Sequence, residues 1–581
     1  MKTHIEKMDS KKWGSPINDP EKMPEHEIRN REEIMALEQE LERSVQAVRS
    51  VGIKAEELHK RGQGTVYERI DQLTDNGEFY PLNTLYNPVE NKDGVGIVTG
   101  IGRVSGKYCV IIASQPSLFA GAWLPGHAEK IFRTQDMSET LRIPLVWLIQ
   151  CSGIMLAEQD KLYAGSRSGG RIFYRNAELS LKGVPVVAGI FGKNMAGGGY
   201  HGISPDATFA HKDATMAVGG AGILEGTGML HGRGFTLENA EKIIRSIQEN
   251  TVSEPGDAKT HYYNTRFFRE IFDTEEGVLN AVRSYISRTP GYAANHFKVR
   301  EYPRLPMLSD QDIYYTLPKN QQWSYNIRQV LARIFDGNEH IEYRPEYGPE
   351  VYCGLAVLDG FLTGIVANIQ GTLPSGYPRY SRKNGIGGKL YDEGLKKMAQ
   401  FVTECSRDGL PMIWFQDTTS IDVGDEAEEA ELLGLGQSLI YSIEQSKIPM
   451  ATIVLRNGMA ASHYVMAGPQ ASGHNVFALG TVLTKICVMY GETAAVATFS
   501  RRLAKAKAEG KALDPIIDEM NKFVEKYKRD SQAIRCAKMG LVDEVVELHN
   551  LRGYLTMFIR AAHQNPAHIC PPHLQMLIRT I

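Results

Sequence analysis

An internal repeat constrains the fold of this chain more than any other feature of its sequence. The segment PVVAGIFGKNMAGGGYHGISP, residues 185–205, aligns without a gap with PMATIVLRNGMAASHYVMAGP, residues 449–469. Two earlier segments, PLVWLIQCSGI from Pro144 and PMIWFQDTTSI from Pro411, match in the same order. Because both segments recur, the chain of 581 residues is predicted to be a duplication that carries two versions of one site.

The repeated segment has the pattern of a strand, a tight turn and the start of a helix. In the first half we predict a strand over Val186–Phe191, a turn over Ala196–Gly199 and a helix from Tyr200. Glycines let a ligand approach backbone N–H groups, and the first N–H groups of a helix add positive potential. The pattern predicts a site for negative charge on an oxygen. Alternatively, the glycines only allow strand and helix to pack closely.

Strands and helices alternate around both copies of the repeat. A β-hairpin is predicted over Gly94–Ser114 and again in the segment that starts at Cys353. Helices are predicted over Val66–Leu73 and Leu390–Cys405. We therefore expect α/β domains with mixed sheets, in which ligands bind at the carboxyl ends of strands.

Three regions are predicted along the chain. Residues 1–60 form an N-terminal helical extension, with an amphipathic helix over residues 28–50. Residues 61–300 form the first domain and residues 301–581 the second. The boundary is placed near Glu301 because the surrounding stretch is rich in Pro and Tyr and has no sustained hydrophobic period.

Composition narrows the class of protein. The hydrophobic fraction is 42% and the charged fraction 23%, as in soluble globular proteins. A formal charge of −3 gives no support for nucleic-acid binding, and we expect a cytoplasmic protein. The seven cysteines contain no CxxC pair, so we predict reduced thiols and no metal site. For Cys151, a buried thiol is favoured over a nucleophile.

Backbone donors in each half could form an oxyanion hole. In each half the donors are expected at the end of the first matched strand and in the turn after the second. These candidate catalytic residues are Gly153, Ile154, Gly197 and Gly198 in the first half, and Ser420, Ile421, Ala460 and Ala461 in the second. One such donor contributes about 2.7 to 4 kcal/mol in a transition state. Two holes suit two carbonyl-bearing reactants, such as the acyl-CoA and the biotin of a carboxyl transfer.

Several motifs carry a resemblance to a known family. ERIDQLTDNGEF near the start, FYRNAEL from Phe173, AVGGAG from Ala217 and GLVDEVV from Gly540 resemble the carboxyltransferase subunits of biotin-dependent enzymes. Over essentially the whole chain, longer motifs are similar to the α subunits of glutaconyl-CoA decarboxylases. These motifs are PLNTLYNP, GAWLPG, YHGISP, GIGGKLY, QDTTSIDVG and AELLGLGQSLIYSI.

The resemblance implies a fold and a function. The fold is two tandem crotonase-like (ClpP/crotonase) domains, the first binding the CoA thioester and the second biotin, with each site completed across a homodimer. The implied reaction converts glutaconyl-CoA to crotonyl-CoA. The carboxyl group passes to biotin on a separate carrier subunit and then to a sodium-pumping membrane subunit. The chain itself contains no MKM biotinylation tripeptide, which agrees with a separate carrier.

Further residues are candidates for binding the two reactants. On the CoA side they are Arg167, Arg171, Arg175, Gly199, Gly219 and Gly220, and on the biotin side Thr419 and His463. The arginines suit CoA phosphates, or they belong to a solvated loop. His463 either tunes biotin or is a structural histidine. Asp417 and Asp422 look like a carboxylate pair, although turn roles are favoured. The second turn departs from the family, because Ala460, Ala461, Ser462 and His463 stand where a Gly-Gly pair is usual.

Three alternatives to a decarboxylase subunit stay open. One is the β subunit of an acyl-CoA carboxylase, which has the same fold and runs the transfer in the opposite direction. Another is a hydratase or isomerase of the crotonase fold, which needs a general acid or base near the first hole. The third is a CoA-binding scaffold without catalysis.

Overall fold

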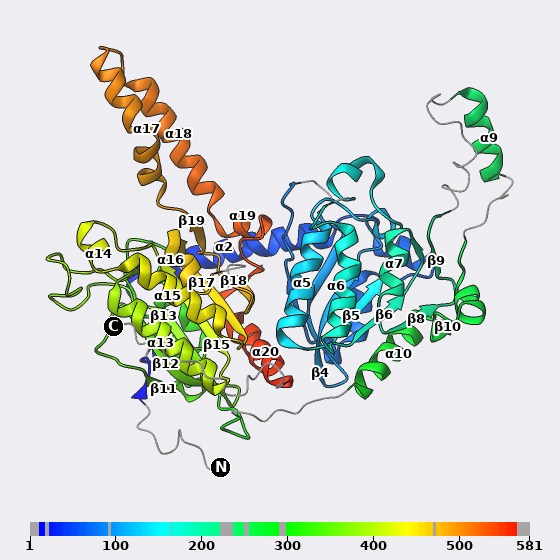
Figure 1. The fold of residues 1–581 in the computed structure, drawn as a ribbon, viewed down its shortest axis with the longest axis horizontal. Coiled ribbons are helices and arrows are strands. Elements are labelled where there is room, and N and C mark those ends of the chain that lie inside the picture. The colour runs from blue at the N-terminus through cyan, green and yellow to red at the C-terminus, as the bar shows by residue number, and fades with distance from the viewer. Residues whose placement is uncertain are drawn as a thin grey trace. The chain divides into compact units, whose positions relative to one another are not determined.

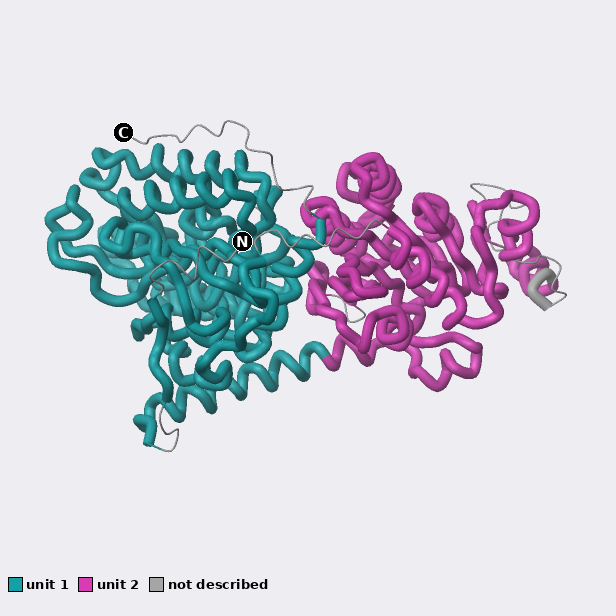
Figure 2. Tube along the Cα trace, turned by 90° about the horizontal axis from the view of Figure 1, so that it is seen from below, with its two compact units in different colours: residues 1–45, 293–581 teal, residues 46–292 magenta. Residues whose placement is uncertain are grey.

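The chain forms two compact units, which Figure 2 shows in different colours. The computed structural model describes residues 11–17, 22–90, 94–163, 165–220, 236–248, 255–289, 298–468 and 472–565. Residues 46–292 form one unit, called here the first-half unit. Residues 1–45 join residues 293–581 in the other, called here the second-half unit.

The first-half unit is built on a mixed seven-stranded sheet with the order β10-β8-β6-β5-β4-β3-β2. Its strands are β2 (Phe79–Leu82), β3 (Ile97–Val104), β4 (Lys107–Ser114), β5 (Leu145–Ile149), β6 (Val186–Ile190), β8 (Ala207–His211) and β10 (Glu270–Phe272). Strands β2, β3 and β4 pair antiparallel, and the pairs from β4 to β10 are parallel. The predicted hairpin over Gly94–Ser114 is therefore confirmed.

Helices cover this sheet (Figure 1). They are α3 (Ala55–His59), α4 (Val66–Leu73), α5 (His127–Leu141), α6 (Gly169–Leu181), α7 (Gly197–Ile203) and α10 (Glu275–Arg288), whereas α9 (Leu237–Gln248) lies away from the sheet in Figure 1. Helix α4 has the predicted bounds because Thr65 and Glu68 form a capping box at its start. Apolar residues of α4 and α10 pack against the sheet in one core cluster, and α5 packs beside α6. Two short paired strands flank α7 in the chain. Strand β7 (Lys193–Met195) precedes the helix and β9 (Thr215–Ala217) follows it.

The second-half unit repeats this sheet. Its strands are β1 (Lys11–Lys12), β11 (Glu339–Glu342), β12 (Val351–Leu358), β13 (Phe361–Asn368), β15 (Met412–Thr418), β17 (Met450–Met459), β18 (Asn475–Gly480), β19 (Lys485–Cys487) and β20 (Glu544–Val545). Strands β11, β12 and β13 pair antiparallel, and β13, β15, β17, β18 and β20 pair parallel in that order. The same succession of pairings in both units confirms the duplication. Trp147 of β5 and Trp414 of β15 are both buried at matching positions.

Among the described residues, the second-half unit contains more helices than the first-half unit. Its helices are α2 (Glu25–Arg49), α11 (Ile313–Thr316), α12 (Ile327–Leu331), α13 (Asp392–Asp408), α14 (Asp425–Glu429), α15 (Leu432–Gln445), α16 (Ala460–Val465), α17 (Gly491–Ala508), α18 (Asp514–Asp530), α19 (Ala533–Lys538) and α20 (Leu551–Gln564). Helix α13 confirms the helix predicted over Leu390–Cys405. Helices α17 and α18 form a hairpin, which extends away from the sheet of its unit in Figure 1.

The N-terminal segment packs onto the second-half unit. Strand β1 pairs with β11, and Asn30 of α2 donates hydrogen bonds to the carbonyl oxygens of Tyr314 and Leu317. The buried carboxylate of Glu38 accepts hydrogen bonds from the Tyr314 hydroxyl and the Leu548 N–H. The linear domain assignment did not anticipate these contacts between residues hundreds of positions apart. Among the described helices, none is long and apolar enough to cross a membrane.

Candidate active site

The glycine run of the first half lies in a helix, which corrects the prediction made from sequence. We expected a turn over Ala196–Gly199 and a helix from Tyr200, but α7 begins at Gly197. Only Ala196 has a positive φ, at 51° with ψ −115°, so the tight turn is concentrated in this one residue. The sequence pattern was misread because glycine suits close helix packing as well as turns.

Each of the three glycines faces a close neighbour. A Cβ atom at Gly197 would lie 2.8 Å from the Trp123 ring, and one at Gly198 would lie 2.3 Å from the Cys151 carbonyl oxygen. At Gly199 the Ala217 carbonyl oxygen would be 3.0 Å away. The close-packing interpretation of the glycines is therefore confirmed. It is compatible with a binding role, because N–H groups in the first turn of a helix have no partner within the helix.

The end of β5 lies beside the start of α7. The N–H of Cys151 donates to Asn194 Oδ1 at 2.9 Å, and the N–H of Met195 donates to the Cys151 carbonyl oxygen at 3.0 Å. Within the described residues, the N–H groups of Gly153 and Ile154 have no hydrogen-bond partner. The structure therefore brings together the two segments that were predicted to supply the first pair of donors.

The second half places its candidates in the same way. Strand β16 (Ser420–Ile421) pairs with β14 (Lys389–Leu390) and contacts α16. Helix α16 begins at Ala460, which has a φ of 53°, and Ala461 follows in its first turn. Ser462 Oγ donates to the Met459 carbonyl oxygen at 2.6 Å, so the hydroxyl is already bonded to the backbone. A strand end again lies beside the start of a short helix.

His463 holds the start of α16 against β15. Its Nδ1 lies 2.7 Å from Gln416 Oε1, and Gln416 Nε2 donates to the carbonyl oxygens of His463 and Met466. Because the amide of Gln416 is oriented by these two bonds, the proton of the neutral ring is assigned to Nδ1. Burial lowers the pKa of His463 to about 4, so the ring is neutral at pH 7.

The candidate arginines of the CoA side all have carboxylate partners. Arg167 pairs with Glu129 at 2.7 Å and Arg171 with Glu178 at 2.7 Å. Arg175 pairs with Asp136, Glu139 and Glu178. Binding of CoA phosphates by these side chains would require an exchange of ion-pair partners. Gly219 and Gly220 follow β9 at the edge of the described residues.

No free carboxylate pair forms at the second site. Asp417 is buried against Arg456, whereas Asp422 accepts hydrogen bonds from Lys389 and Tyr380. The N–H of Thr419 donates to the Gly388 carbonyl oxygen at 2.8 Å. Both carboxylates are thus engaged in ion pairs, and the turn roles favoured from the sequence stay a prediction.

Cys151 is not placed as a nucleophile. Its thiol is buried, and burial raises its pKa to about 12. The thiolate that nucleophilic attack requires is therefore disfavoured at neutral pH.

A pocket that the sequence analysis missed lies beside the first pair of donors. Its volume is about 650 Å³, and Gln150 and Ser152 line it just before Gly153. Arg61 and Lys193 give the lining a basic character. The Arg61 side chain has no ion-pair or hydrogen-bond partner in the part of the chain that the structure describes. No local sequence pattern marks Arg61 as a pocket residue, because most residues that line the pocket with it are distant from it in the sequence.

Comparison with known proteins decides the family. Residues 57–577 match the carboxyl transferase domain. This chain belongs to the carboxyltransferase family. One relative of this carboxyltransferase is the glutaconyl-CoA decarboxylase subunit alpha of Acidaminococcus fermentans. The two are 48% identical over 557 residues, which cover 95% of this chain and 94% of the relative.

Other carboxyltransferases are more distant. A biotin-dependent 3-methylcrotonyl-coenzyme A carboxylase beta1 subunit of Mycobacterium tuberculosis is 27% identical over 79% of this chain and 80% of the relative. The crystal structure of the P. aeruginosa geranyl-CoA carboxylase beta subunit superposes with a TM-score of 0.76 at 22% identity. The superposition covers 95% of this chain and 97% of the geranyl-CoA carboxylase chain. This similarity confirms the predicted fold of two crotonase-like domains.

Proposed function

We propose that this carboxyltransferase moves the distal carboxyl group of glutaconyl-CoA to biotin on a separate carrier subunit and yields crotonyl-CoA. The observation that carries the proposal is the 48% identity with a glutaconyl-CoA decarboxylase α subunit over 95% of the chain. The two backbone sites support it, because both reactants of the transfer present a carbonyl oxygen that gains negative charge.

The first-half site suits the thioester. When the bond between the γ carbon and the distal carboxyl group breaks, its electron pair moves through the double bond to the thioester oxygen. The N–H groups of Gly153, Ile154, Gly197 and Gly198 are the proposed donors to this enolate oxygen. Each donor placed in this way contributes about 2.7 to 4 kcal/mol to transition-state stability. The γ carbon takes up a proton to give crotonyl-CoA, and the proton that the ureido nitrogen of biotin loses on carboxylation balances it.

The residues of the second-half site fit a ureido group. Biotin, when bound, supplies the ureido nitrogen that accepts the carboxyl group. The chain offers first-turn N–H groups of α16 and the strand end at Ser420 and Ile421 as donors to the ureido oxygen. His463 stands in the turn where a Gly-Gly pair is usual. Its imidazole does not block this face, because the ring is directed to Gln416 and is buried.

The partners follow from the same proposal. A carrier subunit would present biotin, and a sodium-pumping membrane subunit would release the carboxyl group as CO₂. Each active site would be completed across a homodimer, between the first half of one subunit and the second half of its partner.

A second candidate is the β subunit of an acyl-CoA carboxylase. The 27% identity with the Mycobacterium tuberculosis carboxylase subunit favours it, and the backbone sites serve either direction of transfer. A hydratase is less favoured, because Cys151, beside the first-half donors, is a buried thiol whose pKa is raised to about 12 by burial.

The test is a carboxyl-transfer assay. Purified chain is mixed with glutaconyl-CoA, with and without free biotin, and crotonyl-CoA is followed by chromatography. Biotin-dependent crotonyl-CoA is expected. If the chain is inactive with glutaconyl-CoA but loads propionyl-CoA or 3-methylcrotonyl-CoA with a carboxyl group from carboxybiotin, the carboxylase assignment replaces the proposal. Hydration of crotonyl-CoA without biotin would favour the hydratase.

A further inference from the structure

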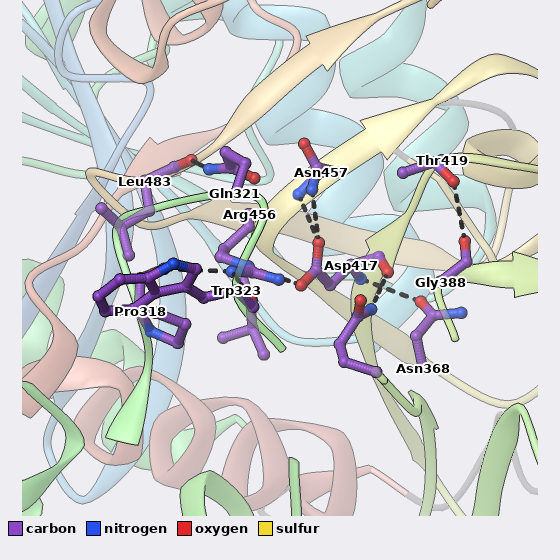
Figure 3. Close-up of polar contacts among 12 residues, drawn as sticks. Pro318, Gln321, Trp323, Asn368, Gly388, Asp417, Thr419, Arg456, Asn457 and Leu483 are labelled. Carbon is purple, nitrogen blue, oxygen red and sulfur yellow. Dashed lines mark hydrogen bonds and ion pairs between the residues drawn. The ribbon is translucent and has the colours of Figure 1, made fainter. Parts of the chain in front are cut away.

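Asp417 is a buried residue near the end of β15 that bonds to several neighbouring segments. It precedes the candidate donors Ser420 and Ile421 by three and four positions, and it is 1% exposed. Its carboxylate accepts hydrogen bonds from Arg456 Nε at 2.7 Å, the Asn457 N–H at 3.1 Å and Asn457 Nδ2 at 2.8 Å (Figure 3). The side chain therefore fastens the end of β15 to β17.

The backbone of Asp417 is held on its other side as well. Its N–H donates to Asn368 Oδ1 at 2.9 Å, and its carbonyl oxygen accepts from Gln370 Nε2 at 2.6 Å. Asn368 is the last residue of β13. Two positions later, the N–H of Thr419 donates to the Gly388 carbonyl oxygen. Strands β13 and β17, together with Gln370 and Gly388 from the stretch between β13 and β14, thus fix the point from which the donor segment leaves the sheet.

Arg456 links this point to a second segment. It is 1% exposed, and its Nη1 donates to the carbonyl oxygens of Pro318 and Asn320 at 3.2 Å each and of Trp323 at 2.9 Å (Figure 3). The guanidinium also lies 4.7 Å from the centre of the Tyr325 ring. One buried cation therefore ties residues 318–323 and the end of β15 to β17.

The first half supports the matching strand end with a different arrangement. Gln150 occupies the position of Asp417 in the aligned segments, and Arg69 Nη2 donates to Gln150 Oε1 at 2.9 Å. The carboxylate partner of Arg69 is Glu275, from a distant helix. Each half thus places a buried arginine at the end of its central strand. Only in the second half is the strand-end residue itself the anion.

We propose that Asp417 and Arg456 are positioning residues of the second-half site, which hold the segment from Thr419 to Ile421 in the geometry that binds the carboxyl acceptor. The proposal deepens the proposed function and rests on it for the identity of the acceptor. Arg456 also binds residues 318–323. The second-half site is therefore complete only when residues 318–323 are packed in place. Removing the carboxylate leaves a buried guanidinium without its anion and releases both segments together.

The first test uses hydrogen–deuterium exchange and needs no activity. In Asp417→Asn, exchange is expected to accelerate at least tenfold in peptides that cover residues 318–325 and 416–422. The matched control is Asp336→Asn, since Asp336 is also buried and accepts from Arg552 and two backbone N–H groups. In the control, these two regions should exchange as in the wild type. Unchanged exchange in Asp417→Asn, or equal acceleration in the control, would overturn the proposal.

The second test is kinetic. Asp417→Asn is expected to raise the KM for free biotin at least tenfold while the Kd for the acyl-CoA, measured by calorimetry, changes less than twofold. If this variant does not fold, Asn457→Ala replaces it, because it removes a donor without leaving an unpaired charge. Parallel changes in both constants would contradict positioning. Turnover by the wild type tests the proposed function separately. If the wild type prefers another acyl-CoA, the wild type and the variant are compared with that substrate.

Discussion

Ala196 and Ala460 adopt nearly the same backbone φ, 51° and 53°, at the start of α7 and α16, the helices that follow β7 and β17. A positive φ is costly for a residue with a Cβ atom, by about 1 to 3 kcal/mol. The same unfavourable conformation at both aligned positions indicates that the sharp turn is part of the duplicated site.

Relief of this strain should be measurable. Ala196→Gly is expected to raise the free energy of unfolding by about 1 kcal/mol, because glycine adopts a positive φ without the steric cost. Urea denaturation measures the change. Ala281→Gly, in the regular helix α10, is the control and should lower stability by about 1 kcal/mol. A loss of stability in Ala196→Gly would mean that the turn is not strained.

The glycines of α7 should tolerate no side chain. A Cβ atom at Gly198 meets the Cys151 backbone, so Gly198→Ala is expected to cost about 1 to 3 kcal/mol and to impair turnover. Gly170→Ala in α6 is the matched control, because a Cβ atom there has no neighbour within 4 Å. It should be neutral or slightly stabilising. Denaturation curves and kcat for both variants check the prediction, and equal behaviour would refute it.

The basic pocket should contribute more to CoA binding than the paired arginines. Arg61→Ala is expected to weaken the binding of free CoA roughly tenfold, because its guanidinium is available to phosphate. Arg171→Ala should have a smaller effect, since Arg171 is paired with Glu178. Calorimetric titration with CoA compares the two. A larger loss of CoA affinity in Arg171→Ala would instead place the phosphate site at the arginines that the sequence analysis predicts.

Glu350 should make stability depend on pH. It is fully buried and accepts hydrogen bonds from the Tyr377 hydroxyl and from the N–H groups of Tyr391 and Gly394. Burial raises its pKa from 4.5 to about 7. Between these values the folded chain holds a proton that the unfolded chain has released. The contribution of Glu350 to the free energy of unfolding is therefore present below pH 4.5 and is lost as the pH rises through about 7.

The variant Glu350→Gln isolates this contribution. Its free energy of unfolding should fall less steeply than that of the wild type between pH 4.5 and 7. Denaturation at several pH values measures both slopes. Identical slopes would show that Glu350 titrates in the folded chain as it does in the unfolded chain.

Local patterns in the sequence predict much of this fold. The aligned blocks place the central strands β5 and β15, and the alternation of apolar residues places the hairpins before them. A capping signal fixes the start of α4. The start of α7 was missed because a glycine run fits a turn and a packed helix equally well, and Trp123, which explains the packing, is far away in sequence.

The supports of the site could not be read from the sequence. Asp417 and Arg456 are 39 positions apart, and Arg456 reaches a carbonyl group 138 positions away. Such contacts have no local period or spacing. The pocket lined by Arg61 and Lys193 depends in the same way on segments that only folding brings together. The candidate backbone donors, which stay a prediction, can be proposed from the sequence because two copies of the same pattern mark their positions.

Isotope transfer tests the proposed carboxyl transfer from glutaconyl-CoA to biotin most directly. Glutaconyl-CoA labelled with ¹³C in the distal carboxyl group is incubated with the purified chain and free biotin, and the acceptor is analysed at once by mass spectrometry. The label is predicted on biotin in an amount equal to the crotonyl-CoA formed. Crotonyl-CoA that forms at the same rate without biotin, with the label only in CO₂, would contradict carboxyl transfer by this chain.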